Sequence, residues 1–239
     1  MNNFELALKC KDIALNHKTL YVLGGIGYRL DAAGKQRALN AYEYNRKVDR
    51  RKKIEAAKDD VWAFDCVNTI KALLWGWTGD KTKLYGGAIY CSNGVPDIGA
   101  DAMIGYCSNV SKDFSRIEIG EAVWMSGHIG IYIGNGLAVE CTPVWKDGVQ
   151  ITSCNCTKVG YNRRDWTKHG KIPWVRYLPM GDLNGDGKVN TEDARIALRA
   201  AIGSEKLTPV QVLAGDFDFD GKISAADARK ILRKSVGLK

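Results

Sequence analysis

Two twelve-residue segments near the C-terminus repeat one pattern, and that pattern restricts what this part of the chain can form. The segments are residues 182–193, DLNGDGKVNTED, and residues 216–227, DFDFDGKISAAD. Each places oxygen-bearing side chains at positions 1, 3, 5, 9 and 12 and glycine at position 6. This is the ligand spacing of an EF-hand calcium loop, in which the glycine permits a sharp turn. The repeat therefore assigns the end of the chain to a calcium module and leaves any catalysis to the residues before it.

Both loops lead into helical patterns, at residues 194–202 and 228–236, but they differ from the loops of calcium sensors. Position 12 is an aspartate, Asp193 or Asp227, where sensors use a longer bidentate glutamate. The sequence also predicts no entering helices, and Pro179-Met-Gly181 stands directly before Asp182. With these features, residues 180–239 resemble the type I dockerin module, a duplicated F-hand whose family binds two calcium ions and a cohesin partner.

The resemblance implies one set of calcium ligands in each loop. Those of the first loop would be Asp182, Asn184, Asp186, Lys188 through its backbone carbonyl, Asn190 and Asp193. Those of the second would be Asp216, Asp218, Asp220, Lys222 through its backbone carbonyl, Ser224 and Asp227. The alternative, two acidic turns without metal, is disfavoured because several carboxylates in one loop repel one another when no cation is present.

The composition of the whole chain excludes some classes of protein. Of its 239 residues 45% are hydrophobic, as in a globular protein with a core, and no apolar run reaches the length of a membrane span. The formal net charge is +8, but the basic residues form no nucleic-acid-binding motif, so we expect no nucleic-acid partner. The N-terminus, MNNFELALKCKD, lacks the basic and apolar regions of a secretory signal, so we expect the protein to be made in a cytoplasm.

Cys66 is the candidate nucleophile among seven cysteines, which in a chain without a signal are expected to be reduced thiols. Apolar residues from Val67 to Trp77 recur with a helical period, and Asp65 is a suitable residue to cap the start of this helix. Cys66 would then lie in the first turn, off the apolar stripe. Free backbone N–H groups and the positive end of the helix dipole would favour its thiolate there.

His128 and Glu140 lie in a segment that predicts two antiparallel strands joined at Gly134-Asn-Gly136. A two-residue turn would place the two side chains on opposite faces of the sheet. A three-residue turn or a bulge would pair Gly130 with Glu140, which brings His128 diagonally beside Glu140 on one face. Cooperation between His128 and Glu140 therefore predicts the second register.

Together the three residues have the logic of a cysteine hydrolase. Cys66 would attack, His128 would act as base and then as acid, and Glu140 would orient the imidazole. The backbone N–H of Cys66, at the helix start, is a candidate oxyanion donor.

At these residues the chain resembles the NlpC-type papain-like cysteine peptidases of bacterial cell walls. The Asp-Cys helix start, the GHIGIYIGNG strand pair and a polar third residue twelve positions after the histidine carry the resemblance. It extends over about residues 4–178, which also look like phage lysins. The family differs in having serine where Val67 stands and often histidine where Glu140 stands, an acidic third member being typical of the related CHAP enzymes.

The resemblance implies hydrolysis of an amide bond in peptidoglycan, by an endopeptidase or an N-acetylmuramoyl-L-alanine amidase, and the sequence leaves the choice of bond open. Asp65, Tyr42 and Trp145 are candidate substrate-binding residues. Two other readings remain: a catalytically inactive papain-like carrier of the dockerin-like module, and an acyltransferase of the same fold.

We therefore expect an α+β, papain-like catalytic domain at residues 1–178, with helices packed on an antiparallel sheet, followed by an all-α calcium domain at residues 180–239. Catalysis should need no cofactor, and the calcium domain should hold two Ca²⁺ ions. The expected partners are peptidoglycan and a cohesin-like protein or a second copy of the chain. Action at the cell wall would follow breach of the membrane.

Overall fold

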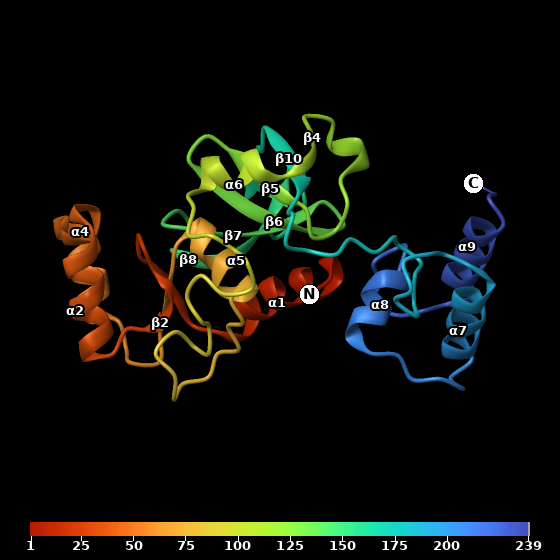
Figure 1. Ribbon diagram of the computed structural model, residues 1–239, viewed down its shortest axis with the longest axis horizontal. Helices are drawn as coiled ribbons and strands as arrows, with labels where there is room; N and C mark the ends of the chain where they lie inside the picture. Colours follow the sequence, from red (N-terminus) through yellow and green to blue (C-terminus); the bar gives the residue numbers. More distant parts are fainter. Residues whose placement is uncertain (239) are drawn as a thin grey trace. The chain divides into compact units, whose positions relative to one another are not determined.

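The computed structural model describes residues 1–238 and has the expected α+β composition, with two sheets and nine α-helices among these residues (Figure 1). By its contacts the chain divides into two compact units, one of residues 9–174 and one of residues 1–8 together with 175–239. In the part of the chain that is described, none of the helices is long and apolar enough to cross a membrane.

The larger unit begins with a small mixed sheet of three strands in the order β1-β3-β2. Strand β3 pairs in parallel with β1 and in antiparallel with β2. Their bounds are β1 (Thr19–Tyr21), β2 (Ile26–Arg29) and β3 (Trp62–Phe64). The helices before β3 are α1 (Asn3–Asn16), α2 (Ala32–Ala41), α3 (Glu43–Arg46) and α4 (Val48–Ala56).

The second sheet has seven strands in the order β4-β10-β5-β6-β7-β8-β9, and all neighbours are antiparallel except β8 and β9. The strands are β4 (Ser108–Ser111), β5 (Ala122–Met125), β6 (His128–Gly134), β7 (Leu137–Thr142), β8 (Gly148–Cys154), β9 (Arg163–Arg164) and β10 (Lys168–Lys171). The predicted strand pair around Gly134-Asn-Gly136 is therefore confirmed as β6 and β7. A 3-10 turn, η1 (Phe114–Arg116), lies between β4 and β5.

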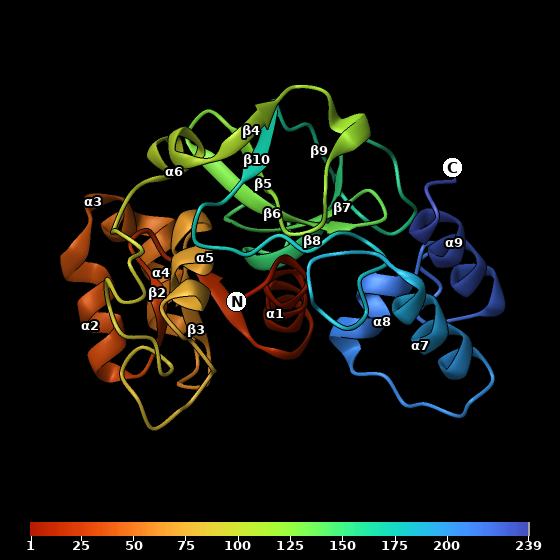
Figure 2. The same cartoon turned by 45° about the vertical axis from the view of Figure 1, so that its right-hand side comes forward.

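Helix α5 (Cys66–Leu74) joins the two sheets, because it follows β3 directly and packs against β6 and β7 (Figures 1 and 2). Its residues are all buried, and the thiol of Cys141 on β7 donates to the carbonyl oxygen of Phe64 just before the helix at 3.3 Å. The predicted helix is thus confirmed, with Cys66 as its first residue. Helix α6 (Ala100–Tyr106) also contacts β5 and β6.

The unit of residues 1–8 and 175–239 includes the start of α1 and, among its described residues, three whole helices: α7 (Thr191–Ala201), α8 (Pro209–Gly215) and α9 (Ala225–Ser235). Helices α7 and α9 lie side by side (Figure 2). The predicted helical runs are confirmed, but they begin earlier because Asn190 and Ser224 cap them from inside the loops. The first residues of the chain join this unit through hydrogen bonds between Asn3 and Leu178.

The prediction of no entering helices is wrong for the second loop. Helix α8 ends at Gly215, immediately before Asp216, and is capped by Thr208 with Pro209 at its first position. Threonine followed by proline is a helix start signal. The segment that follows, Pro209–Gly215, has seven residues, which is enough for about two turns.

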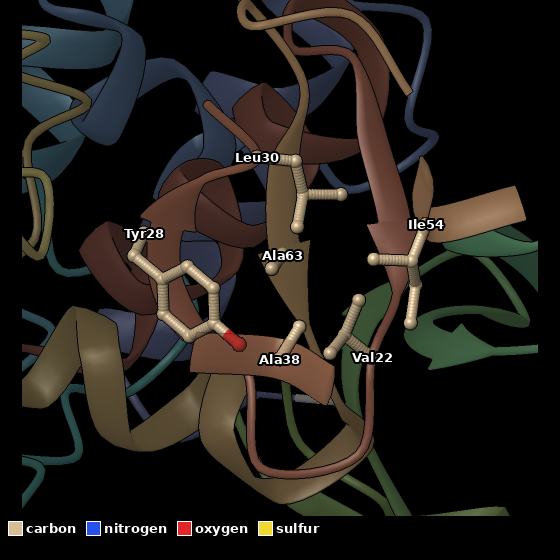
Figure 3. Close-up of a cluster of buried hydrophobic side chains, with 6 residues drawn as sticks. All are labelled: Val22, Tyr28, Leu30, Ala38, Ile54 and Ala63. Atoms are coloured by element: carbon tan, nitrogen blue, oxygen red, sulfur yellow. The ribbon is translucent and has the colours of Figure 1, made fainter. Parts of the chain in front are cut away.

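One part of the core of the larger unit fills the space between the three-stranded sheet and helices α2 and α4. Six buried side chains gather there, as Figure 3 shows: Val22, Tyr28, Leu30, Ala38, Ile54 and Ala63. Leu30 and Ile54 are fully buried. This cluster fixes the small sheet whose central strand leads into α5.

Leu30→Ala should lower the free energy of unfolding by about 2–5 kcal/mol, because it removes apolar contacts and leaves a cavity. Leu15→Ala is the matched control, since Leu15 is 61% exposed and its truncation should change stability by no more than about 0.5 kcal/mol. Guanidinium denaturation followed by tryptophan fluorescence measures both. Equal losses would contradict this account of the core.

Candidate functional site

Cys66 opens α5 in a groove of about 450 Å³ on the larger unit. The helix start is fixed by Asp65, whose carboxylate accepts from the backbone N–H of Asn68 at 2.7 Å, from its side-chain amide at 2.7 Å and from the Gly24 N–H at 2.8 Å. The Cys66 side chain is largely buried but lines the groove.

The expectation that the helix start favours the thiolate of Cys66 is wrong for the resting protein. Burial raises the pKa of the Cys66 thiol to about 12, and the nearby Asp65 carboxylate adds to the rise. Hydrogen bonds from the backbone N–H groups of Ile129, Val67 and Cys66 lower the pKa in the expected direction, but burial outweighs them. Cys66 is therefore a thiol at neutral pH.

The register of β6 and β7 is the predicted one. Gly130 pairs with Glu140, and a bulge lies between Tyr132 and Gly134 beside the turn. Nε2 of His128 lies 2.7 Å from a carboxylate oxygen of Glu140. Because the N–H of Ile129 hydrogen-bonds to the thiol of Cys66, the structure brings Cys66 to the strand that carries His128.

The imidazole of His128 is held in a stacked arrangement. The ring of Trp166 lies parallel to it, with centroids 5.4 Å apart and an angle of 10° between the planes. Gly130 leaves the space for this indole, because a Cβ there would lie 2.6 Å from the carbonyl oxygen of Val139 and 3.2 Å from the Trp166 ring. The glycine at position 130 of β6 thus allows Trp166 to stack on the imidazole of His128.

Glu140 has two further partners that the sequence did not indicate. The guanidinium of Arg164 on β9 donates to it from Nε at 3.1 Å and from Nη2 at 2.8 Å, and the Thr152 hydroxyl donates at 2.8 Å. Burial by itself would raise the pKa of Glu140, but the hydrogen bonds and charges of His128 and Arg164 outweigh it and hold that pKa below its ordinary value. Glu140 is therefore ionised at neutral pH.

A second cluster of the same residue types lies around His169 on β10, and its geometry is different. His169 contacts Glu121 through Nδ1 and the backbone carbonyl of Asp113 through Nε2, the latter at 3.0 Å. Neither ring nitrogen is left to accept a proton from Cys107, whose thiol donates to the Met103 carbonyl. In contrast, the contact of His128 with Glu140 uses Nε2 and leaves Nδ1 of His128 outside that contact.

The three candidate substrate residues fall in different places. Asp65 and Tyr42 line the groove beside Cys66, whereas Trp145 lies with its ring 4.6 Å from the guanidinium carbon of Arg164. Asn68 also lines the groove, and its side-chain oxygen is a buried acceptor without a partner. Its amide orientation is fixed by donation to Asp65, so this oxygen is available to an N–H donor.

The second calcium loop gathers its carboxylates as a cation site requires. Oxygens of Asp216, Asp218 and Asp227 lie within 4.8 Å of one another, and burial together with the Asp218 side chain raises the pKa of Asp216. Oxygen ligands in such a cluster fit Ca²⁺. In the first loop, Asp182 accepts from the N–H of Gly187 and Asp193 from that of Leu183. The second loop has the corresponding bonds, from Gly221 to Asp216 and from Phe217 to Asp227.

Comparison with known protein families supports the C-terminal assignment. Residues 180–234 match the type I dockerin domain. Domains of this type bind calcium and cohesin partners, and the carboxylate cluster of the second loop is consistent with calcium in this part of the chain. A comparison with curated proteins found no match to the chain.

Calorimetric titration should detect two calcium ions per chain, and position 3 of each loop offers a matched pair of variants. Asp218→Ala removes a carboxylate ligand from the second site, and Asn184→Ala removes an amide ligand from the first. Each variant should weaken one binding step by on the order of tenfold and leave the other unchanged. A stoichiometry of one in the unaltered protein would overturn the assignment of two sites.

Proposed function

We propose that the protein is a cysteine-dependent peptidoglycan hydrolase that cleaves an amide bond of the bacterial cell wall. The observation that carries the proposal is the 2.7 Å contact between His128 and Glu140. His128 begins the strand whose Ile129 N–H hydrogen-bonds to Cys66, and Cys66 lines a groove. A thiol, an imidazole with one free nitrogen and an ionised carboxylate are the groups that acyl transfer through a thioester needs.

In the proposed reaction the buried thiol loses its proton as it attacks. Since Glu140 uses Nε2 of His128, Nδ1 is the nitrogen that takes the proton while the sulfur of Cys66 bonds to the carbonyl carbon of the amide. The oxyanion that forms accepts a hydrogen bond from the Cys66 N–H at the start of α5. His128 then gives its proton to the leaving amine, the C–N bond breaks, and water releases the acid from the thioester with His128 again as base.

Both the sequence motifs and the arrangement of helix, sheet and groove support the fold and the substrate that we propose. A helix that begins with the nucleophile and packs against an antiparallel sheet with histidine and a carboxylate on adjacent strands is what a papain-like, NlpC-type domain requires. The groove is lined by the phenols of Tyr21, Tyr42 and Tyr90, which suit a peptide. A net charge of +8 favours approach to anionic wall polymers.

The dockerin-type module would hold this enzyme to a partner. An apolar groove of about 370 Å³ runs between α7 and α9, and it includes Leu198 and Leu232, which are about half exposed. Thr191 and Ala225, at position 10 of the two loops, also line it. We propose this surface as the contact for a cohesin-like protein, a role that is compatible with catalysis in residues 9–174.

Cys66→Ala should reduce lysis of Gram-positive cell walls by about a thousandfold or more, because it removes the thiol that would form the thioester in the groove. Cys156→Ala is the matched control, since Cys156 lies beside Gly136 at the turn of β6 and β7 and should leave activity unchanged. Loss of turbidity measures both variants. Full lysis by Cys66→Ala would rule out the thiol mechanism.

Mass spectrometry of the products identifies the bond, since an amidase releases the lactyl end of muramic acid and an endopeptidase cuts the stem peptide. Adding an amine to the reaction separates hydrolysis from acyl transfer, because an acyltransferase gives the amine adduct in place of the free acid.

A further inference from the structure

The arrangement of the site depends on Glu140, an acidic residue in the interior of the protein. Its side chain is completely buried. A carboxylate taken out of water is strongly destabilised unless hydrogen bonds and opposite charge compensate it. If Arg164 were absent, His128 and the hydroxyl of Thr152 would have to supply that compensation, and Thr152 carries no charge.

Arg164 meets the carboxylate in a forked arrangement. Its Nε lies 3.1 Å from each oxygen of Glu140, and its Nη2 lies 2.8 Å from the same oxygen that contacts His128. The other oxygen receives the Thr152 hydroxyl at 2.8 Å. Rotation of the carboxylate away from His128 would break these contacts, so the fork fixes its orientation as well as its charge.

Arg164 is itself held in place. The ring of Trp145 lies 4.6 Å from the guanidinium carbon, and β9 pairs in parallel with β8 through Cys154 and Arg164. Trp145 adopts a positive φ of 58°, a conformation that is unfavourable for a bulky side chain. An unfavourable backbone conformation persists only where the surrounding structure fixes it. At Trp145 this conformation places the face of the indole against the guanidinium of Arg164.

We propose that Arg164 is a positioning residue for the proposed hydrolysis: it holds the Glu140 carboxylate in place for His128 and offsets its negative charge. The proposal rests on the proposed function and deepens it. The charged groups that act on Glu140 are His128 and Arg164 on β9. From the start of α5, Cys66 contacts the strand of His128, and Asp65 acts on the thiol of Cys66. Without Arg164 the full charge of Glu140 would act on the imidazole and stabilise the imidazolium, which cannot accept the proton of Cys66.

The test compares Arg164→Met, which keeps much of the volume but removes the charge, with Arg164→Lys, which keeps the charge but loses the fork. In Arg164→Met the acidic limb of the kcat/KM profile should move to higher pH by about one unit, because the imidazolium loses a repelling neighbour. Arg164→Lys should leave that limb near its original pH and lower kcat through poorer orientation. A structural role alone would lower activity at every pH without moving the limb.

A second readout needs no turnover. The chain has three histidines, so their ring signals can be followed separately in an NMR titration of isotope-labelled protein. The imidazole of His128 should titrate at higher pH in Arg164→Met than in the unaltered protein, while His17 should not change. Identical titrations and identical pH profiles in the two proteins would overturn the proposal.

The two proposals fail in different ways. Lysis that survives Cys66→Ala refutes the hydrolase, yet the NMR comparison still decides whether Arg164 acts on His128. Loss of lysis in Cys66→Ala with an unmoved limb in Arg164→Met refutes only the role of Arg164. Should Arg164→Met lose its near-ultraviolet circular dichroism, Arg164→Gln replaces it, since the uncharged amide can still donate to Glu140.

Discussion

The buried carboxylate of Glu140 is the constraint around which the larger unit is arranged. It receives donors from three strands, from His128 on β6, Thr152 on β8 and Arg164 on β9. Leaving this buried carboxylate without partners would cost far more free energy than any single contact contributes. These strands must therefore keep their register. The glycine at position 130, opposite Glu140 in the ladder, gives Trp166 the space to stack on the imidazole.

The negative charge of carboxylates is compensated in different ways in the two units. In the larger unit a guanidinium and an imidazole compensate one carboxylate inside the protein. In the second loop, Asp216, Asp218 and Asp227 lie close to one another, and a cation would compensate their like charges. In our proposal the first arrangement adjusts proton transfer, and the second is consistent with calcium binding.

Local sequence patterns were sufficient to predict much of the fold around the candidate site. Asp65 capping α5, the strands around Gly134-Asn-Gly136 and the pairing of Gly130 with Glu140 follow from helix capping and from the two-residue period of strands. Arg164 could not be predicted, because β9 is two residues long and meets β8 only through the fold. The burial of Cys66 was missed for the same reason: a helix start indicates dipole and N–H groups but not how much protein covers them.

That burial changes how the proposed chemistry must proceed. A thiol with its pKa raised to about 12 does not form a resting ion pair with His128, so the proton has to move as the carbon–sulfur bond forms. The rate then depends on how available the imidazole nitrogen is at the working pH. In our proposal, the guanidinium of Arg164 shares the charge of the Glu140 carboxylate, so that Glu140 orients the ring of His128 and leaves it able to accept a proton. In the proposed mechanism, the contact between Arg164 and Glu140 and the burial of Cys66 therefore bear on the same step, the transfer of the Cys66 proton to His128.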